Sequence, residues 1–304
     1  MNELHNFLQL FKNPLKLIKP LGSRGLLNWL PDEIYLKLVF KACLNKKLNL
    51  TNPQTYNEKL QWLKINYRDP LYPKIVDKYE VRTFIKKQIG EDYLIPLIDV
   101  YNNVEEIEWE TLPKKFVLKC THGSGTNIIC KNKDKLDIEK AKKQIEKWMK
   151  KNWYWYGREW AYKKIKPRII CEHLLQNSNG DLPNDYKFMC FNGEPKMVQV
   201  FQGRDKKNLT KDFYNMNWEK MSIQQGAPNS NNKIAKPINF ELMVSIAKKI
   251  SKNFPFARVD LYELNGEVYF GEITLYPASG FTPFNNKKYD YLFGEWLELP
   301  SKNN

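Results

Sequence analysis

The stretch RVDLYELNGEVYFGEIT, residues 258–274, does most to decide the fold of this 304-residue chain. Two runs rich in apolar and aromatic residues flank Asn265-Gly266, a dipeptide that accepts the positive φ values of a type I′ turn. The stretch therefore predicts an antiparallel hairpin. Asp260 and Glu272 lie about equally far from the turn, and a one-residue bulge at Gly271 would bring both to one face.

Two facing carboxylates suggest a metal site. Burying them in an apolar sheet is costly unless a cation neutralises them. Magnesium takes oxygen ligands and commonly bridges to substrate phosphates, so it is the cation we expect for Asp260 and Glu272. Arg258 shares the face of Asp260, where a cation would stabilise charge during phosphoryl transfer. Two unrelated surface carboxylates remain the alternative.

A second hairpin is predicted by KFVLKCTHGSGTNIIC, residues 115–130, which has a loop of small residues. The residues at 123–126 leave backbone N–H groups open to close approach by phosphate. Lys119 ends the preceding strand, where it could meet the same phosphates. The loop lacks the Gly-Lys-Ser/Thr ending of a Walker A loop and the GxGxxG pattern, so an ordinary turn between buried strands is the alternative.

The rest of the chain mixes both kinds of element. Short apolar runs predict strands at 93–101, 168–175, 185–191 and 195–203, the last two joined by an Asn-Gly turn. Helical spacing of apolar residues predicts helices at 31–47, 56–67, 76–90, 137–149 and 239–252. The stretch 205–237 is polar. Several helices and two hairpins without regular βαβ alternation indicate an α+β fold.

The charge balance is strongly basic, with 49 Lys and Arg against 34 Asp and Glu and a net charge of +15. This predicts a polyanionic partner such as a nucleotide or an acidic polysaccharide, with a solvated basic surface as the alternative. The five cysteines form no CxxC pair, which favours reduced thiols in a cytosolic protein. Only three histidines are present, which argues against a zinc site.

The sequence has no apolar run of the roughly 18 residues that a membrane span needs, and no signal-peptide pattern. We therefore expect a cytoplasmic protein. The segment 6–21 combines Leu, Phe and Ile with three lysines, so it could lie on the inner membrane face. Two prolines interrupt it, and docking on the protein body is the alternative.

In this order, the motifs resemble the ATP-grasp superfamily and, more narrowly, its TupA-like branch, found in teichuronopeptide and capsular polysaccharide gene sets. The resemblance covers roughly residues 45–300 and rests on NEKLQWLK (57–64), DKYEVRTFI (77–85), KFVLKCTHGSGTNII (115–129), DYKFMCFNGEPK (185–196) and FARVDLYELNGEVYFGEITLYPASGF (256–281). It implies two α+β lobes with ATP between them. The expected divisions are a helical lead-in at 1–50, a pre-ATP-grasp region at 51–114, a small lobe at 115–175 and a large lobe with the metal site at 176–300.

The resemblance also implies site residues. The nucleotide would be bound by Lys119, His122, Gly123, Ser124, Gly125, Thr126, Glu172, His173, Leu174 and Lys187, with Cys171 beside them. Magnesium would be held by Asp260, Glu272 and Thr274, while Arg258 and Lys187 would be catalytic cations. Many ATP-grasp enzymes have Asn two residues after the metal-binding Glu, and here that residue is Thr274, which puts a second metal site in doubt. His122 could touch a phosphate or pack at the base of the loop.

The chemistry implied by the resemblance is ligation of a carboxylate to an amine through an acyl phosphate, with ATP and Mg²⁺. The TupA setting implies a uronic acid of a surface polysaccharide or its precursor, joined to an amine or amino acid. Residues 131–168 hold 14 Lys or Arg against 5 Asp or Glu, which suits an acidic glycan. The aromatic residues at 153–156 and Trp160 could stack on sugar rings or pack in a core.

Two other functions compete with this one. A glycosyltransferase of the same pathway would more often carry Asp-x-Asp after a Rossmann-like strand, and no such signature stands out. A nucleic-acid binder would use the positive charge and the aromatic cluster, but it leaves Lys119, Asp260 and Glu272 without a purpose. We therefore expect no nucleic-acid partner, and the oligomeric state does not follow from the sequence.

Overall fold

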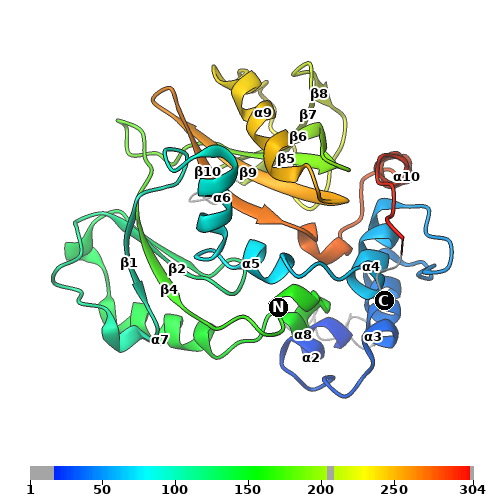
Figure 1. Ribbon diagram of the computed structural model, residues 1–304, viewed down its shortest axis with the longest axis horizontal. Helices are drawn as coiled ribbons and strands as arrows, with labels where there is room; N and C mark the ends of the chain where they lie inside the picture. The colour runs from blue at the N-terminus through cyan, green and yellow to red at the C-terminus, as the bar shows by residue number, and fades with distance from the viewer. Residues whose placement is uncertain (1–16, 204–208, 302–304) are drawn as a thin grey trace, which may run out of the picture.

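The computed structural model describes residues 17–203 and 209–301, which form two antiparallel sheets with helices around them (Figure 1). The strands are β1 (Leu97–Tyr101), β2 (Phe116–Cys120), β3 (Asn127–Cys130), β4 (Ile169–His173), β5 (Asp185–Phe191), β6 (Glu194–Gln202), β7 (Thr210–Asn215), β8 (Lys220–Met221), β9 (Phe256–Leu264) and β10 (Glu267–Thr274). The α-helices are α2 (Ile18–Ser23), α3 (Asp32–Leu44), α4 (Tyr56–Asn66), α5 (Tyr72–Val76), α6 (Val81–Ile89), α7 (Ile138–Met149), α8 (Tyr154–Gly157), α9 (Phe240–Ser251) and α10 (Lys287–Trp296). Short 3₁₀ turns are η2 (Val104–Glu106), η3 (Lys133–Lys135), η4 (Trp160–Tyr162) and η5 (Pro277–Gly280).

The smaller sheet has the strand order β1-β4-β2-β3 and is covered on one face by α7. Alternate residues of β2 and β4 point into this core, where they meet Ala141 and Ile145 of the amphipathic helix. Asp137 caps α7 by accepting a hydrogen bond from the Lys140 amide. Strand β1 belongs to this sheet, although the expected lobe boundary at residue 115 leaves it outside.

The larger sheet has the order β10-β9-β5-β6-β7-β8, and α9 packs against β5, β6 and β9. Both predicted Asn-Gly turns have positive φ at both residues, with 49° and 84° at Asn192 and Gly193 and 53° and 81° at Asn265 and Gly266. These values are those of the type I′ turns that the sequence predicts. Two tight turns fix the register of the four strands that build the site.

Helix α5 lies between the two sheets with α6 beside it, whereas α4 lies at the right of the view near α3 and α10 (Figure 1). Buried residues of all three helices join the core of the larger sheet. Helix α4 begins with a capping box between Thr55 and Glu58 and lies against α10, where the Tyr56 and Phe293 rings meet edge to face with centroids 5.7 Å apart. A separate small core joins α3 to Phe281. The helical lead-in is therefore tied to the chain just after β10.

The predicted α+β class with a helical N-terminal region is confirmed. The polar stretch 205–237 nevertheless contains β7 and β8, which its composition conceals. The polar side chains of these strands have partners inside the fold, since Lys211 donates a hydrogen bond to the amide of Gln225 at 3.0 Å and Lys220 pairs with Asp212 at 2.8 Å. A polar sequence can form a buried strand when its buried polar groups are hydrogen-bonded.

The cysteines predicted as core residues are buried thiols: Cys120, Cys130, Cys171 and Cys190. Burial raises the pKa of Cys120, Cys171 and Cys190 to about 12, which leaves them protonated and unreactive. Among the described residues, no helix is long and apolar enough to cross a membrane. Most of the predicted membrane-surface segment 6–21 lies outside the described residues, and its last part contributes to α2, which contacts α8.

Candidate functional site

The β9–β10 hairpin places Asp260 directly opposite Glu272, with a register shift between Phe270 and Glu272. This is the bulge that the sequence predicts at Gly271. A Cβ on Gly271 would lie 2.8 Å from the Tyr262 ring and 3.1 Å from the Asp260 carbonyl oxygen, so only glycine fits there. The two carboxylates therefore share one face of the sheet because of a local backbone irregularity.

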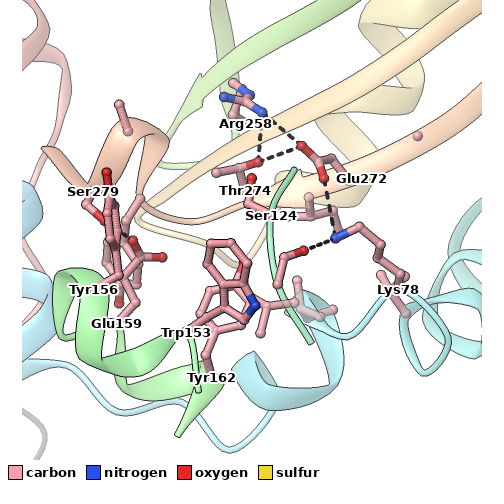
Figure 2. Close-up of a pocket in the computed structure, with 18 residues that line it drawn as sticks. Lys78, Ser124, Trp153, Tyr156, Glu159, Tyr162, Arg258, Glu272, Thr274 and Ser279 are labelled. Carbon is pink, nitrogen blue, oxygen red and sulfur yellow. Dashed lines mark hydrogen bonds and ion pairs between the residues drawn. The ribbon is translucent and has the colours of Figure 1, made fainter. Parts of the chain in front are cut away.

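Arg258 lies at the centre of this face (Figure 2). Its Nε and Nη2 donate to the two oxygens of Asp260, each at 2.7 Å, and Nη2 also donates to Glu272 at 3.2 Å and to the Thr274 hydroxyl at 2.9 Å. A guanidinium is suited to this fork because its donors are planar and always charged. One cation thus holds together three residues that the sequence predicts as metal ligands.

Lys187 reaches the same carboxylate from β5, the neighbouring strand. Its ammonium group pairs with Asp260 and, at 2.9 Å, with Asp185, and all three side chains are buried. Burial raises the pKa of Asp260, while Arg258 and Lys187 act in the opposite direction. Lys187 and Asp260 are among the residues predicted for the site, but neither lines either of the two cavities that adjoin the hairpin.

The glycine loop between β2 and β3 needs its two glycines for different reasons. Gly125 has φ of 69° and open space around it, so it supplies the left-handed backbone of the turn. A Cβ on Gly123 would lie 2.1 Å from the Trp153 indole nitrogen, so that position must leave room for the ring. Between them, Ser124 points into the site (Figure 2).

The segment that begins at Asp77 holds this loop in place. The Lys78 ammonium donates to the Gly123 carbonyl oxygen, and the Lys78 amide donates to the Thr121 carbonyl oxygen at 3.1 Å. Asp77 accepts from Arg168 at 3.1 Å at the start of β4. Lys78 also lies 3.9 Å from Glu272, so it links the loop to the hairpin of the other sheet.

Lys119 leaves the end of β2 and pairs with Glu172 of β4 at 2.6 Å. Arg82 of α6 binds the other oxygen of Glu172 at 3.0 Å. The Glu172 carboxylate is buried behind these two cations. It does not line the cavity of about 450 Å³ that lies between the two sheets, whereas His173 and Leu174 do. In this structure the Glu172 carboxylate holds the Lys119 ammonium group in place and is not accessible from that cavity. Cys171 faces the core of the smaller sheet.

The side chains of His122 and Thr126 are buried and lie against backbone carbonyl oxygens. His122 is 3% exposed, and its Nε2 lies 3.2 Å from the Trp148 carbonyl oxygen at the end of α7. Burial lowers the pKa of His122. The Thr126 hydroxyl donates to the Cys120 carbonyl oxygen at 3.3 Å. His122 thus packs at the base of the loop, which is the second of its two expected roles.

Two cavities adjoin along this frame. The first, of about 450 Å³, lies between the sheets and is lined by Lys119, Ser124, Gly125, Thr126, His173, Leu174 and Tyr262, among others. The second, of about 310 Å³, is lined by Gly123, Trp153, Tyr156, Glu159, Tyr162, Arg258, Thr274 and Ser279, among others. Lys78, Ser124, Gly271 and Glu272 line both cavities and so mark the place where they meet.

Several lining residues were missed by the sequence reasoning: Lys78, Glu159, Tyr162 and Ser279. Lys78 stands in the quoted motif DKYEVRTFI, so a charged residue at the head of an otherwise helical segment was the available signal. The residues of the aromatic cluster have two different surroundings. Trp153 and Tyr156 line the second cavity, whereas Tyr154, Trp155 and Trp160 pack against buried neighbours.

The oxygen donors of the hairpin fit a hard cation in part. Glu272, with a third of its side chain exposed, and the Thr274 hydroxyl both reach the second cavity. Both oxygens of Asp260 are engaged by Arg258 and Lys187. Within residues 17–203 and 209–301 no three His, Cys, Asp or Glu side chains form a metal cluster. A magnesium ion here would need phosphate oxygens among its ligands.

Comparison with known proteins gives one family match. A family model described as TupA-like ATPgrasp matches residues 58–298. No curated protein sequence matches the chain.

Solved structures that are similar to this chain include several ligases. D-alanine–D-alanine ligase from Bacillus anthracis is 16% identical, with a TM-score of 0.39, and the match covers 66% of this chain and 57% of that one. The enzyme of the same name from Helicobacter pylori is 15% identical, with a TM-score of 0.41 and coverages of 80% and 69%. L-amino acid ligase from Bacillus licheniformis is 12% identical, with a TM-score of 0.41 and coverages of 83% and 57%. The chain thus spans little more than half of the first of these ligases.

Proposed function

Because the chain belongs to the TupA-like ATP-grasp family, we propose that it is an ATP- and magnesium-dependent ligase that joins a carboxylate to an amine through an acyl phosphate. The proposed carboxylate is a uronic acid of a surface polysaccharide or of its precursor. The proposed amine is an amino acid or another primary amine. The reaction would take place in the cytoplasm.

The observation that carries this proposal is the pair of adjoining cavities that meet at Lys78, Ser124 and Glu272. A ligase that activates one substrate with ATP must hold the nucleotide and a second molecule on either side of the transferred phosphoryl group. The larger cavity has the glycine loop and Lys119 for a nucleotide. The smaller one opens onto Arg258, which is the side from which a carboxylate would approach.

The residues at the junction carry charges suited to this task. The loop at 123–126 offers backbone N–H groups, and Lys78 and Lys119 offer ammonium groups to the phosphates. Arg258 would face the carboxylate and the phosphoryl group as they are brought together. These cations lower the cost of placing two anions in contact.

The metal would be held by Glu272 and Thr274 together with phosphate oxygens. Asp260 would join them if one of its carboxylate oxygens were released from the hydrogen bonds that Lys187 and Arg258 donate. When bound, Mg²⁺ would neutralise the negative charge of the phosphates. Lys187, which is itself paired with Asp185, would then limit the movement of the Asp260 carboxylate. Glu172 fixes Lys119 in the same way from β4.

The reaction balances without an enzyme nucleophile. A carboxylate oxygen attacks the γ-phosphorus, and the bond to ADP breaks. The neutral amine nitrogen then attacks the carbonyl carbon, and inorganic phosphate leaves with the electron pair of the broken C–O bond. The nitrogen gives up its proton to the departing phosphate or to water. The buried thiols are consistent with this route, because none is poised to act as a nucleophile.

The charge of the chain supports the proposed uronic acid. The basic segment 131–168 includes α7, whose lysines would attract a polyanion. Contact of the N-terminal segment with the inner membrane face would bring a lipid-linked glycan to the enzyme, and this belongs to the same proposal.

A hydroxylamine trap tests the proposed function. Purified protein with Mg²⁺, ATP and D-glucuronate should form a hydroxamate with one ADP released per product, because hydroxylamine intercepts acyl phosphates. Glu272→Gln should lower this rate by about 100-fold or more, the scale on which charge stabilisation acts. Glu267→Gln, on the same strand and exposed, is the matched control.

Two results would overturn the proposal. ATP turnover that is equal in Glu272→Gln and the wild type would exclude the ligase mechanism. A hydroxamate formed with other carboxylates and never with glucuronate would exclude the uronic acid alone.

A further inference from the structure

The second cavity contains a carboxylate that the steps above do not use. Glu159 lies on its wall, across from the Arg258 and Glu272 side (Figure 2). Its Oε1 accepts a hydrogen bond from the Ser279 hydroxyl. Among the described residues, no hydrogen bond or ion pair is formed by Oε2, which leaves this oxygen for a ligand.

The cations around Glu159 serve other partners. Lys64 and Lys19 act on it through space, but neither forms an ion pair with it in the described part of the chain. The buried Lys64 ammonium donates instead to Gln61, to the Gly157 carbonyl oxygen and to the Ser279 carbonyl oxygen, at 3.0, 2.8 and 2.8 Å. Lys19 lies over the Tyr156 ring at 4.7 Å. Burial raises the pKa of Glu159, and Lys64 and Lys19 offset this only in part because neither of these described lysines forms an ion pair with it. An ammonium ligand at Oε2 would supply the direct pairing that the two lysines do not.

The backbone around Ser279 is strained in a way that places its hydroxyl. Ala278 and Ser279 have φ of 49° and 55°, a left-handed conformation that side chains adopt only at a cost. Gln61 and Lys64 of α4 hold this turn by donating to the Ser279 carbonyl oxygen. A Cβ on Gly157 would lie 2.1 Å from the Ser279 hydroxyl oxygen, so Gly157 leaves the space that the hydroxyl fills.

The remaining walls are aromatic. Trp153, Tyr156 and Tyr162 line the cavity beside Glu159. Ring faces attract ammonium groups and repel anions, so these walls favour an amine over a second carboxylate. At about 310 Å³ the cavity is near the lower end of the sizes usual for ligand pockets, which suits a molecule as small as an amino acid or an amino sugar.

We propose that this cavity is the amine pocket of the enzyme and that Glu159, seated by Ser279, binds the ammonium group of the acceptor and takes the proton that frees the nitrogen's lone pair before it attacks. The inference rests on the proposed ligase function and deepens it. The two ends of the pocket then differ in charge, with Glu159 for the ammonium group and Arg258 with Lys78 for the anions of the other substrate and the phosphate. An acceptor with a neutral nitrogen substituent would lose its partner at Glu159.

Binding measured by saturation-transfer difference NMR tests the pocket without requiring turnover. The probes are the protein amino acids, ethanolamine and D-glucosamine, each compared with its N-acetyl derivative, in the presence of Mg²⁺ and a non-hydrolysable ATP analogue. At least one amine should bind at millimolar concentration, and its N-acetyl derivative should not. Glu159→Gln should weaken that binding roughly ten- to hundredfold, the strength of a hydrogen bond to a charged group.

Two further variants keep the test decisive. Glu139→Gln on α7, an exposed residue, should leave binding unchanged. Ser279→Ala keeps the carboxylate and removes the hydroxyl that seats it, so it should weaken amine binding by a smaller factor, and it carries the test if Glu159→Gln does not fold. Affinity for the ATP analogue should be the same in both Glu159→Gln and Ser279→Ala as in the wild type.

The proposal is overturned if no amine of the panel binds the wild type, if N-acetyl derivatives bind equally well, or if the folded Glu159→Gln or Ser279→Ala variant binds amines as the wild type does. Amine binding that depends on Glu159, in a protein that forms no hydroxamate from any carboxylate, would support the amine pocket and reject the ligase function. The two failures are therefore distinguishable.

Discussion

The β9–β10 hairpin and the β2–β3 loop face the same junction but are built in opposite ways. The hairpin acts through side chains, since Arg258, Asp260 and Lys187 form a buried network of charges. The loop acts through its backbone, and its glycines matter for what they lack. The geometry of the hairpin site is therefore already set in the absence of a ligand, and it requires each of the charged side chains in the network. The geometry of the loop requires the free space next to its glycines.

The largest effect should come from breaking the charge network of the hairpin. Asp260→Ala leaves the buried Lys187 and Arg258 without their shared carboxylate, so we expect a loss of about 3–5 kcal/mol of unfolding free energy. Urea denaturation measures this loss. The double variant Lys187→Met with Asp260→Ala should recover part of it, and strictly additive losses would show that the two charges are not coupled.

A smaller effect should follow from filling the space next to the loop. Gly123→Ala places a methyl group against the Trp153 indole, and overpacking of this kind costs about 1–3 kcal/mol. Thermal unfolding and affinity for an ATP analogue measure the result. Adding Trp153→Ala should restore nucleotide affinity, and no restoration would place the damage elsewhere than at the ring.

The base of the loop should give the protein a pH dependence. Burial lowers the pKa of His122 in the folded protein, so the unfolded chain binds its proton first as the pH falls. Stability from this group is present above the usual pKa of about 6.5 and falls below it, with a slope of at most about 1.4 kcal/mol per pH unit. Urea denaturation between pH 7 and 5 should have a flatter profile in His122→Gln. Equal slopes in both proteins would contradict this.

The smallest effect is expected at the other glycine. Gly125→Ala meets no neighbouring atom but must adopt φ near 69°, which costs about 1–2 kcal/mol locally. Because the loop is exposed there, it can relax, and we expect stability to fall by about 1 kcal/mol or less with a clear loss of affinity for the ATP analogue. Gly266→Ala, with similar φ in a turn remote from the junction, is the matched control and should leave that affinity unchanged.

The sequence predicted the local parts of the site well. Asn265-Gly266 predicted the turn, Gly271 the bulge, and the spacing of Asp260 and Glu272 their pairing, since each depends on residues close in the chain. The prediction that Lys119 ends its strand beside the loop is likewise met. The assignment of Glu172 and His122 to nucleotide contact stays a prediction, and both side chains are buried in this structure.

What the sequence by itself determined is the two hairpins of the site and the charges placed on one face of the final hairpin, because turn chemistry and the alternation of strands act over a few residues. Only the tertiary structure decided that Lys78 and Trp153 border the glycine loop and that Glu159 meets Ser279. Lys78 and Gly123 are separated by 45 residues in the sequence, and Glu159 and Ser279 by 120. No local preference of the sequence predicts these contacts, because they form only when segments far apart in the chain pack together in the folded protein.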